Sequence, residues 1–323
     1  MSWPTVSVVV ETWNLDGELE ILRRLLAALT PQLGDAELVI THACIPPMLR
    51  AELAGDRAVT WVPVELTTGY YDHKNAGFAA STGDVVAFID GDCDPDPDWL
   101  AHLIAPIVRG AANVVAGDTS YRGALATIAN RLDFPYFTHD RTRGTVRNFF
   151  ANNVAFARGA FMEVGGYPAI PSMFHGQCQV LALHLRESGI AIHYAGTARV
   201  IHAWPANALA WLEVRLLRGA DTTTLLPFIV AHYAPRAPKL VTGRIPALGI
   251  LAARSVAGFA LALRHGPRVK GLALVAAITV VDSIGCLAGP TVYRAYGVTT
   301  PAPPPVPTPV TLDVVPPEAR RVG

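Results

Sequence analysis

The sequence predicts an α/β protein with a mostly parallel sheet flanked by helices, followed by a C-terminal pair of apolar helices. From the start of the chain to about residue 117, short β-branched runs alternate with amphipathic stretches, a pattern typical of a sheet with helices on its faces. Residues 245–263 and 271–289 are two long apolar runs, separated by a basic turn. The hydrophobic content of 51% exceeds what one soluble α/β core normally requires. Some apolar surface must therefore face something other than that core.

Five short apolar runs are the predicted strands of the first part of the sheet. They cover residues 6–10, 37–40, 58–62, 84–89 and 113–116. Leucines recur at helical spacing between the first two runs, which predicts a helix that packs one face on the sheet. We expect Pro31 to end this helix. A further strand is predicted just before His202.

Charge and cysteine content exclude several classes of function. The 26 basic and 26 acidic residues balance, so no long-range positive field favours nucleic acid as a partner. The four cysteines have no CxxC spacing, which fits neither a disulfide framework nor a zinc site. The opening MSWPTVSVVVE lacks a basic stretch followed by an apolar run, so the chain before the apolar pair is expected to stay in the cytoplasm.

The segment GDVVAFIDGDCD is a buried strand that ends in alternating carboxylates. Asp90, Asp92 and Asp94 are two residues apart, so in an extended chain they project to the same side. In open parallel sheets, ligands bind beyond the carboxyl ends of the strands. Mg²⁺ or Mn²⁺ uses one or two carboxylates and completes its shell with water and substrate phosphates. The segment therefore predicts a divalent metal site that stabilises a leaving diphosphate.

These motifs resemble those of the family 2 glycosyltransferases, which have the GT-A fold. The opening VSVVVETWN is similar to the first strand of that family and its nucleotide-contacting turn, which implies that Thr12, Trp13 and Asn14 lie near the base. The segment YYDHKNAG resembles the one whose basic residue and asparagine face the nucleotide sugar. The resemblance therefore implies a donor-binding role for Lys74 and Asn75.

The resemblance also implies the residues of the metal site. Asp90 and Asp92 occupy the DxD motif of the family, the first near the ribose and the metal and the second on the metal. His202 stands where related enzymes often place a histidine ligand, although a structural histidine at a strand end is the alternative. The similarity extends from residue 6 to about residue 202.

Two departures from the family pattern affect the predicted chemistry. After the second strand the chain reads VITHACIPP, without the usual paired aspartates, so the selectivity for the base stays open. The catalytic carboxylate of the family lies in a Gly-Glu-Asp pattern, where this chain has Gln177 and Cys178. No neighbouring Asp or Glu replaces it in the sequence. We therefore expect His175, or alternatively His184, to act as the base, with a loop histidine of no catalytic role as the other interpretation of His175.

The predicted function is the metal-assisted transfer of a sugar from a nucleotide-sugar donor to a hydroxyl acceptor, with a lipid carrier among the acceptors considered. The alternative is a catalytically degenerate protein of the same fold that binds a nucleotide sugar without turnover. A dinucleotide-dependent oxidoreductase is disfavoured because no GxGxxG follows any strand. The predicted domains are a GT-A catalytic domain at residues 1–232, a membrane-associated helical hairpin at 233–298 and a disordered Pro-rich tail at 299–323.

The hairpin is predicted to lie in the cytoplasmic leaflet, at the cytoplasmic side of the cell membrane. Each apolar run is long enough to cross a bilayer. Two crossings would place Arg264, Arg268 and Lys270 outside, against the positive-inside tendency. On one side of the membrane, these cations can instead meet anionic headgroups. A hairpin that docks on the catalytic domain without any membrane is the alternative.

Charges and glycines inside the two runs favour close packing of the hairpin. Arg254 and Asp282 lie at similar depth in an antiparallel pair, so they can form an ion pair. Gly285 and Gly289 are spaced as GxxxG, which allows another helix to approach closely.

Overall fold

A computed structural model describes most of the chain before the C-terminal tail. It covers residues 4–15, 19–133, 139–140, 144–170, 173–205, 207–233 and 243–296. The predicted disordered tail at residues 299–323 and the side chain of Asn14 lie outside the described parts.

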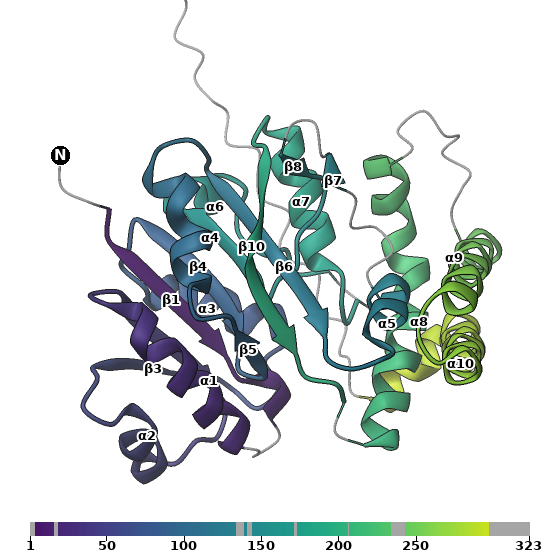
Figure 1. The fold of residues 1–323 in the computed structure, drawn as a ribbon, viewed down its shortest axis with the longest axis horizontal. Coiled ribbons are helices and arrows are strands. Elements are labelled where there is room, and N and C mark those ends of the chain that lie inside the picture. The colour runs from purple at the N-terminus through teal and green to yellow at the C-terminus, as the bar shows by residue number, and fades with distance from the viewer. Residues whose placement is uncertain are drawn as a thin grey trace, which may run out of the picture.

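A mostly parallel sheet forms the centre of the molecule (Figure 1). Its strands run in the order β3-β2-β1-β4-β9-β6-β10-β8-β7, and β5 pairs with β10. β9 is antiparallel to both of its neighbours, β4 and β6. The bounds are β1 (Val6–Glu11), β2 (Glu37–His42), β3 (Val59–Pro63), β4 (Val85–Asp90), β5 (Cys93–Pro95), β6 (Val114–Tyr121), β7 (His139–Asp140), β8 (Thr145–Val146), β9 (Asn153–Ala157) and β10 (Ile192–His202). All five strands predicted from the first part of the sequence, and the one before His202, are confirmed.

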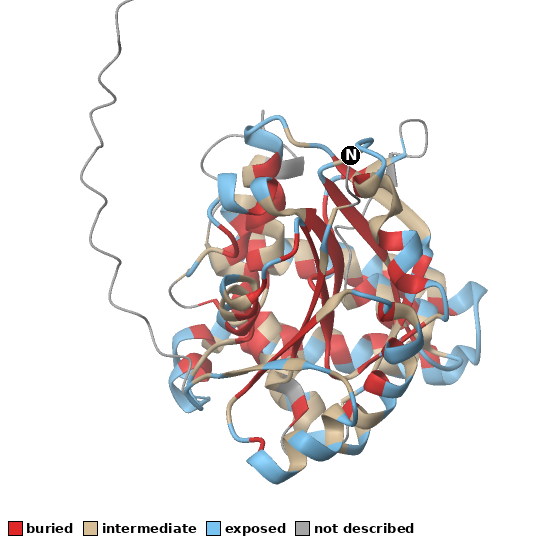
Figure 2. Ribbon diagram, turned by 90° about the vertical axis from the view of Figure 1, so that its left-hand side faces the viewer, coloured by how far each residue is buried: buried red, intermediate tan, exposed pale blue. Residues whose placement is uncertain are grey.

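Helices cover both faces of this sheet. The bounds are α1 (Leu19–Leu33), α2 (Pro47–Ala54), α3 (Tyr70–Ala80), α4 (Trp99–Val108), α5 (Ala126–Asp133), α6 (Arg158–Glu163), α7 (Gln177–Glu187), α8 (Ala208–Tyr233), α9 (Arg244–Arg264) and α10 (Arg268–Ala295). Side chains of α1 and α4 pack with one face of β1, β2 and β4, and those of α3, α6 and α7 pack with the other. Figure 2 accordingly shows the central strands buried between helices whose outer sides are exposed.

The expectation that Pro31 ends the first helix is wrong. α1 continues to Leu33 with Pro31 in its last turn. A proline at this position removes only one backbone donor from the helix, and the side-chain amide of Gln32 donates to the carbonyl of Ala28 at 2.9 Å. The buried leucines of the helix, Leu33 among them, hold this last turn on the sheet.

The strand ends bring the predicted site residues together at one edge of the sheet. β1 and β4 pair in parallel with Glu11 beside Asp90, and β6 pairs in parallel with β10 with Tyr121 beside His202. The carboxyl ends of four strands therefore meet at the same edge, where ligands of open α/β sheets bind.

The C-terminal helices form a layer beside the sheet, in contact with α5 and α8 (Figure 1). The predicted pairing of Arg254 with Asp282 is confirmed, because an Nη of Arg254 donates to a carboxylate oxygen of Asp282. That carboxylate is fully buried and also accepts two bonds from Arg215 of α8. Arg215 in turn pairs with Asp133 at the end of α5. A buried ionic network thus links the hairpin to the rest of the protein.

The GxxxG motif of α10 packs against α8 and not against the other helix of the hairpin. A Cβ added at Gly285 would lie 2.1 Å from the carbonyl oxygen of Leu216 in α8. Gly219 of α8 makes the reciprocal approach, because a Cβ there would lie 2.2 Å from the carbonyl oxygen of Asp282. The close approach that the motif allows is therefore made with α8 as the partner.

Candidate active site

A cleft of about 1040 Å³ lies along the carboxyl edge of the sheet. Its lining includes the turn after β1, the segment after β2, residues of α8 and one residue of α9. Six of the predicted site residues line it: Thr12, Trp13, Asp90, Asp92, His175 and His202. The fold therefore places residues from distant parts of the sequence around one cavity.

Asp90 ends β4 and is held by two residues of α3. The ammonium group of Lys74 lies 2.5 Å from its Oδ1, and the hydroxyl of Tyr70 donates to its Oδ2 at 2.9 Å. Asp90 and Lys74 are both buried, and a buried charge is tolerated when it is paired in this way. The carboxylate is fixed in position before any ligand binds.

Asp92 and His202 lie next to each other in the cleft. The Nε2 atom of His202 lies 3.6 Å from Oδ1 of Asp92 and 3.9 Å from Oδ2 of Asp90. The Nδ1 atom of His202 lies 2.7 Å from the carbonyl oxygen of Ala203, so donation to that carbonyl leaves Nε2 as a bare acceptor. Within the described residues, Oδ1 of Asp92 is buried without a hydrogen-bond partner. Burial, with some repulsion from Asp90, raises the pKa of Asp92.

This arrangement fits a divalent metal ion. A cation between Asp92 and His202 would give the orphaned carboxylate oxygen a partner and offset its burial. The backbone bond of the other imidazole nitrogen is the usual arrangement that orients a metal-binding histidine. Carboxylate oxygens and an imidazole nitrogen suit Mn²⁺, and carboxylate oxygens suit Mg²⁺.

The third aspartate of the predicted cluster does not reach the cleft. The chain turns after Asp90 and continues as β5, which pairs with β10, so the extended geometry assumed for Asp94 is wrong. Asp94 is exposed and accepts a bond from Arg122 at 2.6 Å. The thiol of Cys93 instead lies within 4.8 Å of the ligand atoms of Asp92 and His202.

Aromatic side chains line the cleft next to these carboxylates. The ring of Trp13 contacts Tyr70 edge-on and Phe174 at a tilt, with centroid distances of 6.3 and 5.3 Å. The backbone N–H of Trp13 donates to Glu11 at 2.8 Å, and Thr12 donates to the carbonyl of Thr41 at 2.9 Å. These bonds fix the turn after β1 and present the indole to the cleft.

His175 lies in the loop that precedes α7. Its ring packs against Phe174 and Tyr70, and within the described part of the chain its Nδ1 is buried without a hydrogen-bond partner. Burial, followed by the nearby Arg218 and His202, holds the pKa of His175 well below its usual range. The imidazole is therefore neutral at physiological pH and keeps an acceptor nitrogen, while the same burial makes it a weaker base than an exposed histidine.

Known proteins share the sequence pattern of the first half of this chain. Residues 7–167 match the family model described as Glycosyl transferase family 2. The chain carries a family 2 glycosyltransferase domain. Its fold is that of the mannosyltransferase PcManGT from Pyrobaculum calidifontis, with a TM-score of 0.60 and 18% identity over 89% of this chain and 88% of that one.

Three curated relatives show how much of this chain, and of each relative, the sequence similarity covers. The succinoglycan biosynthesis protein ExoM of Rhizobium meliloti is 26% identical over 70% of this chain and 76% of its own length. The glucosyl-dolichyl phosphate glucuronosyltransferase of Haloferax volcanii is 32% identical over 29% of this chain. This match covers 33% of the length of the Haloferax protein. The match to the pre-mycofactocin glycosyltransferase of Mycobacterium tuberculosis covers 37% of the length of that protein.

Two residues implied by the family 2 resemblance do not line the cleft. Lys74 is fully buried behind Asp90, to which it is bound. Asn75 bonds through its side chain to the backbone N–H and carbonyl of Tyr167, and so anchors the turn that contains Gly166. Lys74 therefore fixes the position of Asp90, and Asn75 fixes the position of the turn that contains Gly166.

The family carboxylate is absent, but the structure brings another carboxylate to the same loop. Gln177 bonds to the carbonyl of Met173, and Cys178 accepts a bond from Tyr71. Asp221 of α8 accepts the backbone N–H groups of Phe174 and His175, each at 2.7 Å. Burial raises the pKa of Asp221 to about 7, against the lowering effect of these bonds.

The prediction missed Asp221 because it is 46 residues away from His175 in the chain. No spacing pattern in the sequence signals that contact. No Asp or Glu stands near His175 along the chain, as expected, but in space Asp221 lies beside its loop. His184 lies two turns along α7 and is not among the residues that line the cleft.

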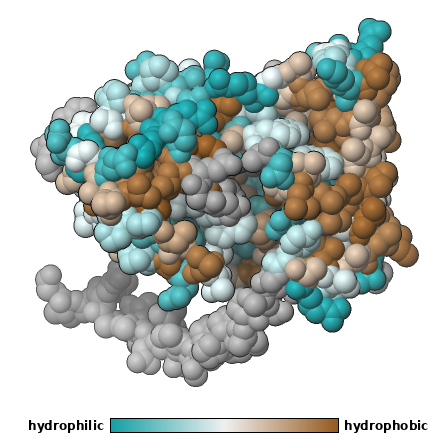
Figure 3. Space-filling view, turned by 90° about the horizontal axis from the view of Figure 1, so that it is seen from below, coloured by the Kyte–Doolittle hydropathy of each residue, from teal (hydrophilic) through white to brown (hydrophobic). Residues whose placement is uncertain are grey.

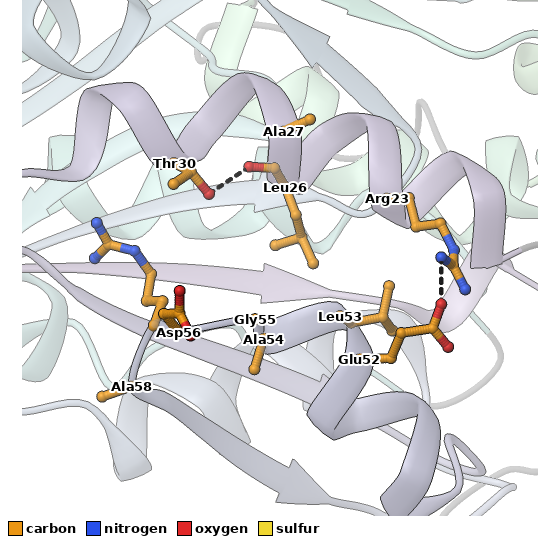
Figure 4. Close-up of a pocket in the computed structure, with 11 residues that line it drawn as sticks. Arg23, Leu26, Ala27, Thr30, Glu52, Leu53, Ala54, Gly55, Asp56 and Ala58 are labelled. Carbon is orange, nitrogen blue, oxygen red and sulfur yellow. Dashed lines mark hydrogen bonds and ion pairs between the residues drawn. The ribbon is translucent and has the colours of Figure 1, made fainter.

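A second depression of about 700 Å³ lies between α1 and α2 (Figure 4). Arg23 and Glu52 line it and form an ion pair at 2.6 Å, and Thr30 donates to its own helix at Leu26. None of the metal-site or loop residues described above lines this depression. The cleft at the carboxyl edge is therefore the candidate active site of the family 2 domain.

Proposed function

We propose that this protein transfers a sugar from a nucleotide-sugar donor to a hydroxyl acceptor with the help of a divalent metal ion. The observation that carries the proposal is the cluster of Asp90, Asp92 and His202 in a large cleft at the carboxyl edge of the sheet. PcManGT is known in complex with GDP-Man and Mn²⁺, and GalNAc-T7, of TM-score 0.51 and 15% identity, with UDP, GalNAc and Mn²⁺. The same ligand classes, a nucleotide sugar and a divalent metal, suit the groups that line this cleft.

One group of cleft residues would assist the departure of the diphosphate, and another would activate the acceptor hydroxyl. Asp92 and His202, with Asp90 beside them, would hold the metal. When bound, the metal neutralises charge on the leaving diphosphate. Tyr70 and Lys74 keep Asp90 in place for this role. Thr12 and Trp13 lie where the base of the donor would sit, with the indole ring as a flat apolar surface.

His175 is the group that would activate the acceptor. Its neutral imidazole lines the cleft and can accept the proton of the acceptor hydroxyl as the hydroxyl oxygen bonds to the anomeric carbon of the sugar. The bond from that carbon to the diphosphate breaks, and the electron pair leaves with the diphosphate. Asp221 positions His175 by accepting the N–H groups of its loop.

We further propose that α9 and α10 lie in the plane of the cytoplasmic leaflet. Both are long and apolar enough to cross a membrane, yet only 28% and 33% of their most apolar windows are buried. Their exposed large apolar residues are Ile245, Val256, Leu263, Val269, Val280, Ile284 and Leu287. At 100° per residue, the members on each helix fall within about 60° of one another, so each helix presents one apolar stripe. Hydrophobic residues gather on this side of the molecule in Figure 3.

The other faces of these helices support an in-plane position. They pack on α5 and α8, where Arg254 of α9 and the buried Asp282 of α10 bond with each other and Asp282 also bonds with the buried Arg215 of α8, so the hairpin stays next to the sheet. Arg264, Arg268 and Lys270 of the turn are exposed and are available to anionic headgroups. A lipid-linked acceptor would then approach the cleft from the same membrane surface.

A donor-hydrolysis assay distinguishes this function from its alternative. The purified full-length chain is incubated with Mn²⁺ and a panel of nucleotide sugars on uridine and guanosine, and release of the nucleoside diphosphate is measured. Release that requires the metal supports the transferase. Binding of a nucleotide sugar without release, also in the presence of candidate hydroxyl acceptors, would show the catalytically degenerate binding protein.

A further inference from the structure

A thiol lies beside two of the residues that are proposed to hold the metal. Cys93 follows Asp92 in the chain, and the antiparallel pairing of β5 with β10 makes it the direct partner of His202 (Figure 1). Side chains of directly opposed residues project from the same face of a sheet, with Cβ atoms about 4.5–5.5 Å apart. The strand register therefore makes the thiol of Cys93 and the imidazole of His202 neighbours.

The ligand atoms of these three residues share one small space. A carboxylate oxygen of Asp92, the sulfur of Cys93 and an imidazole nitrogen of His202 all lie within 4.8 Å of one another. In a tetrahedral Zn²⁺ site, bond lengths of about 2.0–2.3 Å put neighbouring ligand atoms about 3.3–3.7 Å apart. The three atoms therefore need shifts of about 1 Å to surround an ion of this size.

The surroundings of the three atoms also favour a cation. Within the described residues, Oδ1 of Asp92 is buried without a hydrogen-bond partner, and donation from Nδ1 of His202 to Ala203 leaves its Nε2 as an acceptor. Burial, followed by the charges of Asp92 and Asp90, raises the pKa of the Cys93 thiol well above its usual range. A cation bound to the sulfur offsets this cost, because the thiolate is the form that metals bind.

The sulfur distinguishes between classes of divalent ion. Mg²⁺ and Mn²⁺ prefer oxygen ligands and keep open positions for water and substrate phosphates, so Cys93 adds little to their binding. Zn²⁺ readily takes a thiolate, an imidazole and a carboxylate together in a four-coordinate shell. Three protein ligands leave one open position on Zn²⁺, whereas a diphosphate that is held through two oxygens needs two.

We propose that Asp92, Cys93 and His202 bind Zn²⁺, and that this ion inhibits the protein by displacing the metal that the transfer uses. The inference rests on the proposed function, because it concerns a competing ion at the same place in the cleft. The thiol of Cys93 releases its proton to solvent when Zn²⁺ binds. Cys93 thereby makes sugar transfer depend on the ratio of Zn²⁺ to Mn²⁺.

The test is a metal titration of the full-length chain in detergent, with Co²⁺ as the probe. Co²⁺ accepts the ligands of Zn²⁺, and a cobalt–thiolate bond gives a strong charge-transfer absorption in the near ultraviolet. We expect this absorption in the wild type and its loss in Cys93→Ser and Cys93→Ala. Cys44→Ser and Cys178→Ser remove the exposed and the half-buried thiol, and both should keep the absorption. An equimolar amount of Zn²⁺ should abolish it, whereas Mn²⁺ should need an excess of at least about 100-fold.

The second readout is the rise in Tm that UDP or GDP produces in the presence of saturating Mn²⁺. Zn²⁺ should diminish this rise in the wild type, because it displaces Mn²⁺ and leaves one position for the diphosphate. Cys93→Ser should need at least about 10-fold more Zn²⁺ for the same effect, since the loss of the outer partners of a metal site alone costs about 10- to 100-fold in affinity. Cys44→Ser should respond to Zn²⁺ as the wild type does.

Several outcomes would overturn this assignment. A wild type without thiolate absorption, but with the Mn²⁺-dependent rise in Tm, would exclude Cys93 as a ligand and leave the proposed function intact. Absorption that persists in Cys93→Ser would assign the thiolate to another cysteine. If neither Cys93 variant folds, a chain in which Cys93 is the only cysteine should still show the absorption, and its loss would contradict the inference. Failure of the proposed function itself would appear separately, as the absence of any rise in Tm with UDP or GDP and Mn²⁺ while the thiolate absorption is present.

Discussion

At the scale of single residues, the half-buried His175 and the buried Asp221 beside the cleft differ in their hydrogen bonding. The Nδ1 atom of His175 has no partner among the described residues, whereas Asp221 accepts two backbone N–H groups and the hydroxyl of Tyr293. An unpartnered neutral imidazole is suited to receive a proton. A carboxylate that is already bound on several sides is suited to hold a loop.

The two histidines proposed from the sequence should therefore behave differently. His175→Ala is expected to lower the transfer rate by about 10²- to 10⁴-fold, the usual contribution of a general base. His184→Ala should retain the rate, because this side chain does not line the cleft. The measurement is kcat with a saturating donor. Full turnover in both variants would show that the base lies elsewhere.

Asp221 should make the stability of the protein depend on pH. Its pKa is raised from 3.8 to about 7, so between these values the folded protein keeps a proton that the unfolded chain releases. The free energy of unfolding therefore falls as the pH rises through this window, by up to roughly 4 kcal/mol for this group. The Tm of the wild type relative to Asp221→Asn should decrease from pH 4 to pH 8. A difference in Tm that does not change with pH would contradict the assignment, and Asp98→Asn, an exposed residue, is the control.

At the scale of elements, the long helix α8 connects the catalytic cleft to the hairpin. One of its faces contributes Asp221 and Arg218 to the cleft, and another packs on α10 through Gly219. The predicted domain boundary after residue 232 coincides with the end of α8 in the structure, and it remains a prediction. The same helix therefore lines the cleft with one face and packs on the hairpin with another.

The packing of α10 on α8 predicts a specific sensitivity to substitution. Gly285→Ala should lower stability by about 1–3 kcal/mol, because the new methyl group would meet the backbone of Leu216. Gly249→Ala in α9 is the matched control, since a Cβ there meets no atom within 4 Å. That change should leave the Tm unchanged or raise it, by about 0.5–1 kcal/mol of stability. Equal Tm values for the two variants would contradict the packing of α10 on α8.

At the scale of the whole molecule, the sequence predicts elements better than it predicts contacts between them. The strands follow from periodic apolar runs, and Asp90, Asp92 and His202 follow from their positions at strand ends. Periodicity does not report which helix a glycine will meet, so the partner of Gly285 required the structure. The role of Asp221 depends on the path of α8 past the loop of His175, which no local pattern encodes.

The in-plane arrangement of the hairpin can be tested on the whole protein in sealed vesicles. His265→Cys places a reactive thiol in the exposed turn between α9 and α10, in a background with the exposed Cys44 and the half-buried Cys178 replaced. A membrane-impermeant reagent should label it only from the cytoplasmic side. Labelling only from the outside would show that the helices cross the bilayer. Full solubility without detergent would favour a hairpin that docks on the catalytic domain alone.

The most direct test of the central claim is the metal dependence of nucleotide binding. The Tm of the full-length chain is measured with UDP or GDP, with and without Mn²⁺, for the wild type, Asp92→Asn and Asp94→Asn. We predict a Mn²⁺-dependent rise in Tm with at least one nucleotide for the wild type and for Asp94→Asn, whose side chain pairs with Arg122 outside the cleft. Asp92→Asn should lose this rise, because it removes the charge of the carboxylate next to His202. Equal shifts with and without Mn²⁺ in the wild type would contradict the account.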